Sequence, residues 1–263
     1  MSKNITRGGS WGRHLKGSTE KSFFKRKTSA FQKGGKNASF IEHLSKTNNC
    51  NMKLYISGRL YDWLIEPIVK RIKQKVAFYF QTYDLFPALD ICCGTGTQCH
   101  ILGKKNSNVY GLDIDLRMVG YAARKYPQRS FICADATKNS FRNNSFKGII
   151  ISFSMHDKTS EIRDEIMKEA QRLLSSGGTV AFVDFENPWN FRSKLGSVFS
   201  FMIERAAGGE HFKNNRRFLK QGGLRGLIQR HQLVEIERHN IELGAMAIVL
   251  TRLRDEWSSE WSN

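Results

Sequence analysis

The 263-residue chain has no uninterrupted apolar run near the length of about 18 residues that a membrane-spanning helix needs. Its N-terminus lacks the apolar core of a secretory signal peptide, so no such peptide is expected. The five cysteines have no repeating spacing, and no Cys/His cluster has zinc-finger spacing, so we expect neither a disulfide framework nor a bound metal. These absences favour a cytoplasmic protein without an integral membrane segment.

Acidic residues are scarce: 24 Asp and Glu accompany 42 Lys and Arg, which gives a net charge of +18. Residues 1–50 supply half of the excess, because their 11 Lys and Arg are opposed only by Glu20 and Glu42. This segment is rich in Lys, Ser, Gly and Asn and has no apolar periodicity, so we predict a mostly disordered extension. Three interpretations stay open: a solvated basic extension, an arm for RNA or an anionic surface, and an organellar presequence, which is less favoured.

Residues 51–255 have the pattern of one α/β domain. Apolar residues at helical spacing predict an N-terminal helical lid over 54–80, which Pro67 should kink or split. Predicted strands cover residues 88–92, 108–112, 131–133, 147–153, 179–184, 233–238 and 245–250. One predicted helix starts at about residue 97, and others cover residues 116–124, 162–176, 190–206 and 223–231, with Gly177-Gly178 ending the helix at 162–176. This alternation predicts a doubly wound, seven-stranded, mostly parallel sheet of the Rossmann-like type.

The turn after the first predicted strand is rich in glycine. Residues 89–97 read Leu-Asp-Ile-Cys-Cys-Gly-Thr-Gly-Thr, in which Gly94 and Gly96 permit a tight turn and a close approach of a ligand to the backbone. Cys99 stands where a dinucleotide-binding turn has its third glycine, and the Gly-Lys-Ser/Thr of a P-loop is absent. The turn therefore favours a nucleoside over a dinucleotide or a triphosphate.

Acidic residues accompany the first three predicted strands. Asp90 precedes the glycines, Asp113 ends the second strand and Asp135 follows the third. A carboxylate at the end of the second strand can accept hydrogen bonds from both hydroxyls of a ribose. A carboxylate after the third strand can accept one from the exocyclic amine of adenine. The details thus favour a nucleoside that bears a carboxylate.

In this order, the motifs resemble those of the class I S-adenosylmethionine-dependent methyltransferases. The matching segments are 89–97, 109–115, 134–136, 144–152 and 169–178. The resemblance implies the Rossmann-like methyltransferase fold, with S-adenosyl-L-methionine as cofactor. The predicted cofactor-binding residues are Asp90, Cys92, Gly94, Thr95, Gly96, Asp113, Ile114, Asp135, Ala136 and Ser152. In the family's pattern the glycines and the first aspartate shape the methionine end, the second aspartate binds the ribose, and the third, with the alanine after it, flanks the adenine.

Two residues depart from the family's pattern. Asp115 stands where many relatives have serine, just after the ribose-binding acid, and Lys147 stands where many have aspartate at the start of the fourth strand. Neither position is a presumed cofactor ligand, so the predicted cofactor site is unaffected.

Two histidines are candidates for acid–base chemistry on the methyl acceptor, because imidazole titrates near neutral pH. His156 follows the fourth predicted strand in the polar segment 154–157, and a second polar segment, 184–188, follows the fifth strand. His211 lies in a predicted loop, 206–212, and is the second candidate. Both histidines can equally be surface or helix-capping residues.

The segments expected to contact the methyl acceptor resemble those of the small-molecule branch of the family, which includes the ubiquinone and menaquinone methyltransferases. The resemblance lies in the helical lid and in an apolar insertion at about 186–222, whereas the distinguishing quinone-enzyme motifs around the fourth strand are absent. We therefore predict transfer to a small acceptor, with a lipophilic, quinone- or lipid-like molecule as the favoured kind. An RNA or protein methyltransferase that uses the basic tail, and a catalytically silent cofactor-binding domain, are the alternatives.

Overall fold

The computed structural model describes residues 63, 66–187, 209–241 and 244–254. The predicted basic extension, most of the lid before residue 66 and the predicted helix at 190–206 lie outside the described residues. Within the described part of the chain, no helix is long and apolar enough to cross a membrane.

A seven-stranded sheet forms the centre of the domain, with strand order β3-β2-β1-β4-β5-β7-β6. All neighbouring strands pair in parallel except β7, which is antiparallel to both β5 and β6. The strands are β1 (Ala88–Ile91), β2 (Val109–Asp113), β3 (Ser130–Cys133), β4 (Phe146–Ser152), β5 (Leu174–Phe185), β6 (Leu233–Ile241) and β7 (Met246–Leu253). All seven predicted strands are therefore confirmed, and so is the doubly wound α/β class.

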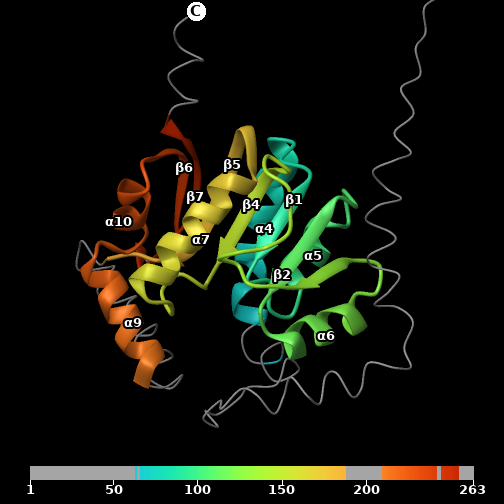
Figure 1. Cartoon of the computed structure of the whole chain (residues 1–263), viewed down its shortest axis with the longest axis horizontal. Helices are drawn as coiled ribbons and strands as arrows, with labels where there is room; N and C mark the ends of the chain where they lie inside the picture. The colour runs from blue at the N-terminus through green and yellow to red at the C-terminus, as the bar shows by residue number, and fades with distance from the viewer. Residues whose placement is uncertain (1–62, 64–65, 188–208, 242–243, 255–263) are drawn as a thin grey trace, which may run out of the picture. The chain divides into compact units, whose positions relative to one another are not determined.

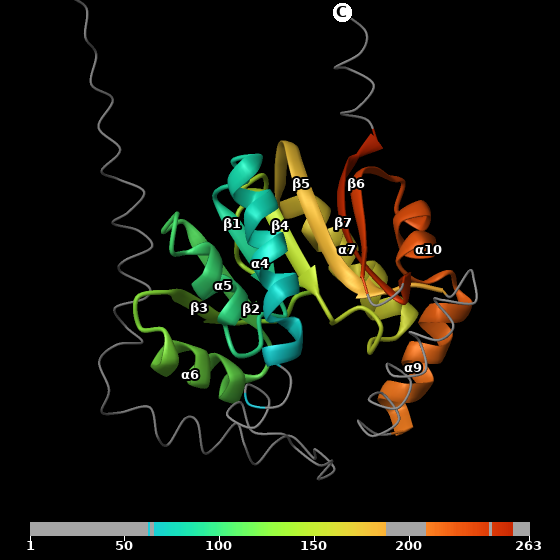
Figure 2. The same cartoon turned by 180° about the vertical axis from the view of Figure 1, so that it is seen from behind.

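Helices cover both faces of this sheet (Figures 1 and 2). On one face, α4 (Glu66–Thr82) and α5 (Thr97–Leu102) pack against alternate residues of the central strands, such as Ala88 and Ile150. On the other face, α7 (Ser160–Leu173) and α10 (Gly223–Arg230) pack against the residues between them, such as Leu89 and Ile149. Because successive side chains of a strand point to opposite faces, strands covered on both sides are apolar throughout.

Two further helices complete the described part of the domain. The helix α6 (Leu116–Lys125) contacts β2 and β3, and α9 (Gly209–Lys220) precedes α10 in the chain. The prediction of a loop over 206–212 is wrong for its described part, since Gly209 to Phe212 form the first turn of α9. Gly208 and Gly209 suggested a loop, but buried contacts of Phe218 and Asn214 further along α9 hold the helix against the domain.

The predicted end of the helix before β5 is also wrong. The helix α7 ends at Leu173, and Leu174 is already extended, with φ −72° and ψ 130°. The pair Gly177-Gly178 lies inside β5, where the pairing with β4 shifts register between Phe146 and Gly148. Gly177 has a φ of +67°, so the glycines mark an irregularity of the strand instead of a helix terminus.

The predicted kink at Pro67 concerns a helix whose first part is not described. The described part of α4 begins at Glu66, Trp63 is also helical, and residues 64–65 lie outside the described residues, so the predicted kink is not tested.

Candidate active site

The glycine-rich turn joins β1 to α5 at the carboxyl edge of the sheet. Cys92, Gly94 and Gly96 all have positive φ values, of 59°, 53° and 74°. A Cβ atom at Gly96 would lie 2.5 Å from the Phe131 ring, so this glycine is needed for packing. A Cβ at Gly94 would meet nothing within 4 Å. The backbone at Gly94 therefore faces open space that a ligand can occupy.

Asp113, at the end of β2, holds this turn in place. Its Oδ2 accepts a hydrogen bond from the Gly94 amide at 2.8 Å, and its Oδ1 accepts one from the Asp115 amide at 2.9 Å. Each carboxylate oxygen has two lone pairs, so the half-buried carboxylate retains capacity for two hydroxyl donors. Asp115 itself caps α6 by accepting from the Arg117 amide at 2.9 Å, which gives this departure from the family's pattern a structural role.

A cavity of about 150 Å³ opens beside the turn. Its lining comprises Lys73, Asp90, Cys92, Cys93, Gly94, Thr95, Gln98, Met118, Ser152 and Phe153. The buried Gln98 Oε1 and Ser152 Oγ atoms have no hydrogen-bond partner among the residues that the structure describes. Because buried polar atoms are rarely left unpaired, these two atoms are suited to bind polar groups of a ligand.

The cavity contains five of the ten predicted cofactor residues: Asp90, Cys92, Gly94, Thr95 and Ser152. It also contains Lys73, Gln98 and Met118, which sequence reasoning missed. These three lie on α4, α5 and α6, and their helical positions alone gave no indication that they face the turn.

Asp90 lies in β1 at the floor of the cavity and is only 2% exposed. Burial raises its pKa to about 7, although the Cys99 thiol, which donates to its Oδ2 at 3.4 Å, and the nearby charge of Lys73 act in the opposite direction. Burial also raises the pKa of the Cys92 thiol to about 12. This cysteine is therefore a neutral packing residue and not a thiolate nucleophile.

Replacement of Asp90 with asparagine should change the pH dependence of stability. The folded pKa of about 7 lies above the ordinary value of 3.8, so the wild type loses stability as the pH rises from 4 to 7. Across this range the loss amounts to roughly 3 kcal/mol, and the uncharged amide of the variant should not show it. Urea unfolding at several pH values measures this, with Asp84→Asn at an exposed carboxyl as the control. Equal pH slopes for the wild type and Asp90→Asn would contradict the prediction.

The predicted adenine side lies at the ends of β2 and β3, whose residues Asp113 and Cys133 are paired. Ile114 is 68% exposed, an unusual exposure for an aliphatic side chain, and offers an apolar surface to a planar base. Asp135 is exposed, and its Oδ1 accepts from both the amide and the hydroxyl of Thr137 at 2.8 Å. Ala136 is buried beside it. The structure therefore places all the predicted adenine-side residues at one edge of the sheet.

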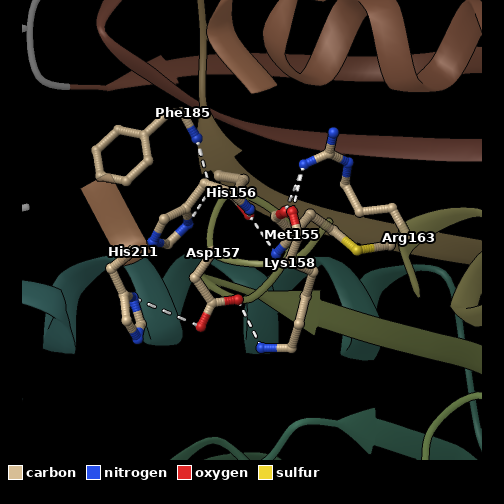
Figure 3. Close-up of polar contacts among 8 residues, drawn as sticks. Met155, His156, Asp157, Lys158, Arg163, Phe185 and His211 are labelled. Atoms are coloured by element: carbon tan, nitrogen blue, oxygen red, sulfur yellow. Dashed lines mark hydrogen bonds and ion pairs between the residues drawn. The ribbon is translucent and has the colours of Figure 1, made fainter. Parts of the chain in front are cut away.

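His156 lies on the loop after β4 and is 6% exposed (Figure 3). Its Nδ1 is 2.6 Å from Oδ1 of Asp184, which is completely buried near the end of β5. The Phe185 ring stands nearly perpendicular to the imidazole, with 4.7 Å between the ring centroids. The two polar segments predicted to face an acceptor thus meet through this histidine and this aspartate.

His211, the second candidate, lies at the start of α9 and is more exposed. Its Nδ1 is 3.8 Å from Oδ2 of Asp157, and the other oxygen of that carboxylate accepts from Lys158 Nζ at 2.5 Å (Figure 3). Asn214 of α9 also donates to the Asp157 carbonyl oxygen at 2.9 Å. The structure therefore brings both candidate histidines to the loop after β4, although they come from segments far apart in the sequence.

Arg163 of α7 fixes the same loop from the other side (Figure 3). It is 1% exposed and donates to the carbonyl oxygens of Met155 and Lys158, and to the side chain of Gln221 beyond α9. Sequence reasoning missed this residue, since an arginine in an amphipathic helix is usually solvated. A cationic side chain with no carboxylate among these partners acts here as a clamp on backbone carbonyl groups.

Comparisons with known proteins agree with this arrangement. A family model described as a methyltransferase domain matches residues 88–178. A 2-phytyl-1,4-naphtoquinone methyltransferase of Thermosynechococcus vestitus is 32% identical over 107 residues, which cover 38% of this chain and 47% of that protein. A demethylmenaquinone methyltransferase of Renibacterium salmoninarum is 31% identical over 100 residues, or 38% of this chain and 41% of that protein. The matched region thus spans less than half the length of these two relatives.

The solved structure of the N-methyltransferase NodS from Bradyrhizobium japonicum, in complex with S-adenosyl-L-homocysteine, has the same fold. It superposes with a TM-score of 0.50 at 15% identity, and the match covers 70% of this chain and 87% of that chain. Residues 88–178 thus match the model of a methyltransferase domain, and the described sheet has the fold of this solved structure.

Proposed function

We propose that this protein is an S-adenosyl-L-methionine-dependent methyltransferase that acts on a small molecule. The main support is the pairing of Asp113 with the glycine turn. Its carboxylate holds the Gly94 amide at 2.8 Å beside backbone that is open to a ligand. This arrangement suits a ribose whose two hydroxyls donate to the carboxylate while the rest of the nucleoside passes over the turn.

The residues of the cavity and those at the neighbouring ends of β2 and β3 fit the two ends of this cofactor. Asp113 would hold the ribose, and Ile114, with Asp135 and Ala136, would flank the adenine. Asp90, Cys92, Thr95 and Gly96 would shape the methionine end, where the Ser152 hydroxyl also lies. When bound, S-adenosyl-L-methionine supplies a methyl group that its sulfonium has already activated.

The charge of the site favours a cationic nucleoside over a pyrophosphate. Asp113 is close enough to Asp90 to act to raise the pKa of Asp90. The Asp113 carboxylate, together with the fraction of Asp90 that is ionised near pH 7, would repel a pyrophosphate and attract a sulfonium or an ammonium group, while the Lys73 ammonium in the cavity lining opposes this effect. This contrast distinguishes the proposed cofactor from a nicotinamide dinucleotide.

For the acceptor, we propose a lipophilic, quinone- or lipid-like molecule. The named functions of the two curated relatives support this class, and a ubiquinone/menaquinone biosynthesis C-methyltransferase of Cupriavidus metallidurans is 24% identical over 181 residues. The apolar insertion predicted to contact such a molecule lies mostly outside the described residues, as does the basic extension invoked for RNA.

Isothermal titration calorimetry of the full chain tests the cofactor assignment. We expect S-adenosyl-L-homocysteine to bind with a dissociation constant on the order of 1 µM, corresponding to about −8 kcal/mol. Nicotinamide adenine dinucleotide, tested under the same conditions, should show no binding. Absence of S-adenosyl-L-homocysteine binding, or equal affinity for the dinucleotide, would reject the proposed function.

Transfer to the acceptor can be followed separately with radiolabelled S-adenosyl-L-methionine. A reduced, prenylated 1,4-naphthoquinone with one unsubstituted quinone-ring carbon should become labelled, while its fully substituted counterpart should not. Binding of the cofactor without any labelling would reject the quinone-like acceptor but not the cofactor assignment.

A further inference from the structure

Gln98 is a buried polar residue in the wall of the cavity. It lies in the first turn of α5, two residues after Gly96, and is only 3% exposed although it lines the cavity. Its Nε2 donates to the Lys73 carbonyl oxygen at 3.3 Å, whereas its Oε1 has no partner among the described residues. A buried amide oxygen without a partner costs free energy, so a ligand group that donates to it would be bound favourably.

The contact with Lys73 fixes the orientation of the Gln98 amide. A backbone carbonyl oxygen only accepts hydrogen bonds, so the atom of the amide that faces it is the nitrogen. Rotation of the amide by half a turn would place two oxygen atoms against each other. Oε1 is therefore the atom available to a ligand, and it can only accept a hydrogen bond.

The same contact joins two helices, α4 and α5, which lie side by side on one face of the sheet (Figure 2). Lys73 of α4 and Gln98 of α5 both line the cavity. The wall of the cavity thus holds the amide in place before any ligand arrives, which reduces the entropy that is lost on binding.

Other uncharged polar side chains of the lining are less selective than Gln98. The Ser152 hydroxyl also has no partner among the described residues, but a hydroxyl can donate or accept, so a ligand group of either kind satisfies it. The Thr95 hydroxyl has a neighbour in the Thr97 hydroxyl at 3.4 Å. Of the three lining residues Gln98, Ser152 and Thr95, only Gln98 requires a donor from the ligand.

The proposed cofactor has one group that meets this requirement at the right place. Asp113, Ile114 and Asp135, which are proposed for the ribose and the adenine, are not part of the cavity lining. The cavity therefore suits the amino-acid end of the cofactor. At that end the carboxylate and the sulfur have no hydrogen to donate, whereas the ammonium group has three.

The charged residues of the lining suit a zwitterionic amino-acid end. Asp90 lies at the floor of the cavity, and its Oδ2 accepts from the thiol of Cys99, the residue after Gln98. The ionised form of Asp90 would attract an ammonium group placed at Gln98. Lys73, of opposite charge, lies in the same lining, so both signs of the zwitterion have a counterpart there.

We propose that Gln98 accepts a hydrogen bond from the α-ammonium group of the cofactor through Oε1, and so selects nucleoside ligands that have a free α-amino group. The inference rests on the proposed function and adds a specificity-determining residue to it. A nucleoside thioether without the amino group would leave Oε1 unpaired, so the site would bind it more weakly.

Calorimetry of the full chain with two ligands tests this role without any methyl transfer. The ligands are S-adenosyl-L-homocysteine and its deaminated analogue, in which hydrogen replaces the α-amino group. The wild type should bind the first at least about 10-fold more tightly, as expected for a hydrogen bond from a charged donor. Gln98→Met, which keeps the length of the side chain, should lower this ratio about 10-fold through weaker binding of S-adenosyl-L-homocysteine alone.

A matched control and a measurement on the wild type complete the test. Gln229→Met makes the same substitution at an exposed position of α10 and should keep the wild-type ratio. Urea unfolding establishes whether each variant is folded. If Gln98→Met does not fold, nuclear magnetic resonance of the wild type decides, because the side-chain amide ¹⁵N resonance of Gln98 should shift with S-adenosyl-L-homocysteine and not with the deaminated analogue.

The outcomes separate the two proposals. Failure of the wild type to bind S-adenosyl-L-homocysteine would reject the proposed function. Normal binding of this ligand with equal affinity for the deaminated analogue would overturn the role of Gln98 alone. An unchanged ratio in folded Gln98→Met, equal weakening of both ligands, or the same amide shift with both ligands would also overturn it.

Discussion

Replacement of Asp113 with alanine should weaken binding of S-adenosyl-L-homocysteine by about 100-fold or more. The side chain would lose two hydrogen bonds from ribose hydroxyls to a charged acceptor, each contributing about 1.5–3 kcal/mol. The Gly94 amide would also lose its acceptor at 2.8 Å, so the turn would be less well ordered for binding. Calorimetry of the wild type and the variant under identical conditions measures the change in affinity.

The control for this variant comes from the same turn. Asp115→Ala removes the cap of α6 and should lower the free energy of unfolding by about 1 kcal/mol, but it should leave cofactor affinity within about twofold of the wild type. Asp113→Asn, which retains one accepting oxygen, should have intermediate affinity. Equal affinity of Asp113→Ala and wild type would remove Asp113 from the ribose site.

Alanine at the two glycines of the turn should have opposite consequences. Gly96→Ala should lower the free energy of unfolding by roughly 2–4 kcal/mol, because it combines a left-handed backbone with overpacking. Its Cβ would lie 2.5 Å from the Phe131 ring and 2.9 Å from the Ala122 Cβ. Gly94→Ala meets nothing within 4 Å, so only the backbone cost of about 1 kcal/mol is expected.

For ligand affinity we expect the reverse order, with the larger effect from Gly94→Ala. The Gly94→Ala methyl group would project into the space proposed for the cofactor, so we expect affinity for S-adenosyl-L-homocysteine to fall at least about tenfold in a folded protein. Urea unfolding and calorimetry on the same samples separate the two effects. If Gly94→Ala bound as tightly as the wild type, the cofactor would not pass over this part of the turn.

The central fold was predictable because strands covered on both faces leave an unambiguous apolar signal. Residues Ile149, Ile150 and Ile151 alternate between the two faces and are all fully buried. The boundaries were less predictable where glycine has more than one use. Gly177 and Gly178 suggested a helix end, yet they lie within β5, and the glycine that begins α9 suggested a loop.

The candidate site was predictable where a motif and a strand end coincide, and less so elsewhere. Asp113 was assigned correctly to the end of β2, next to the glycine turn. Asp184 was recognised only as part of a polar segment, because its contact with His156 joins residues 28 positions apart. Lys73 and Arg163 face the site from helices, and nothing in their local sequence distinguishes them from solvated residues.

The placement of β7 has a consequence for synthesis of the chain. β7 follows β6 in the sequence but lies between β5 and β6, and it forms every described pairing of β6 and the pairing on one edge of β5. Until residues 246–253 have left the ribosome, that edge of β5 has no partner, and its apolar residues Ala181 and Val183 lack the neighbours Leu250 and Ile248. A messenger RNA truncated before codon 246 would therefore yield a polypeptide with an unpaired, aggregation-prone sheet edge. Such a polypeptide would be bound by chaperones or degraded by proteases and would not be a shortened enzyme.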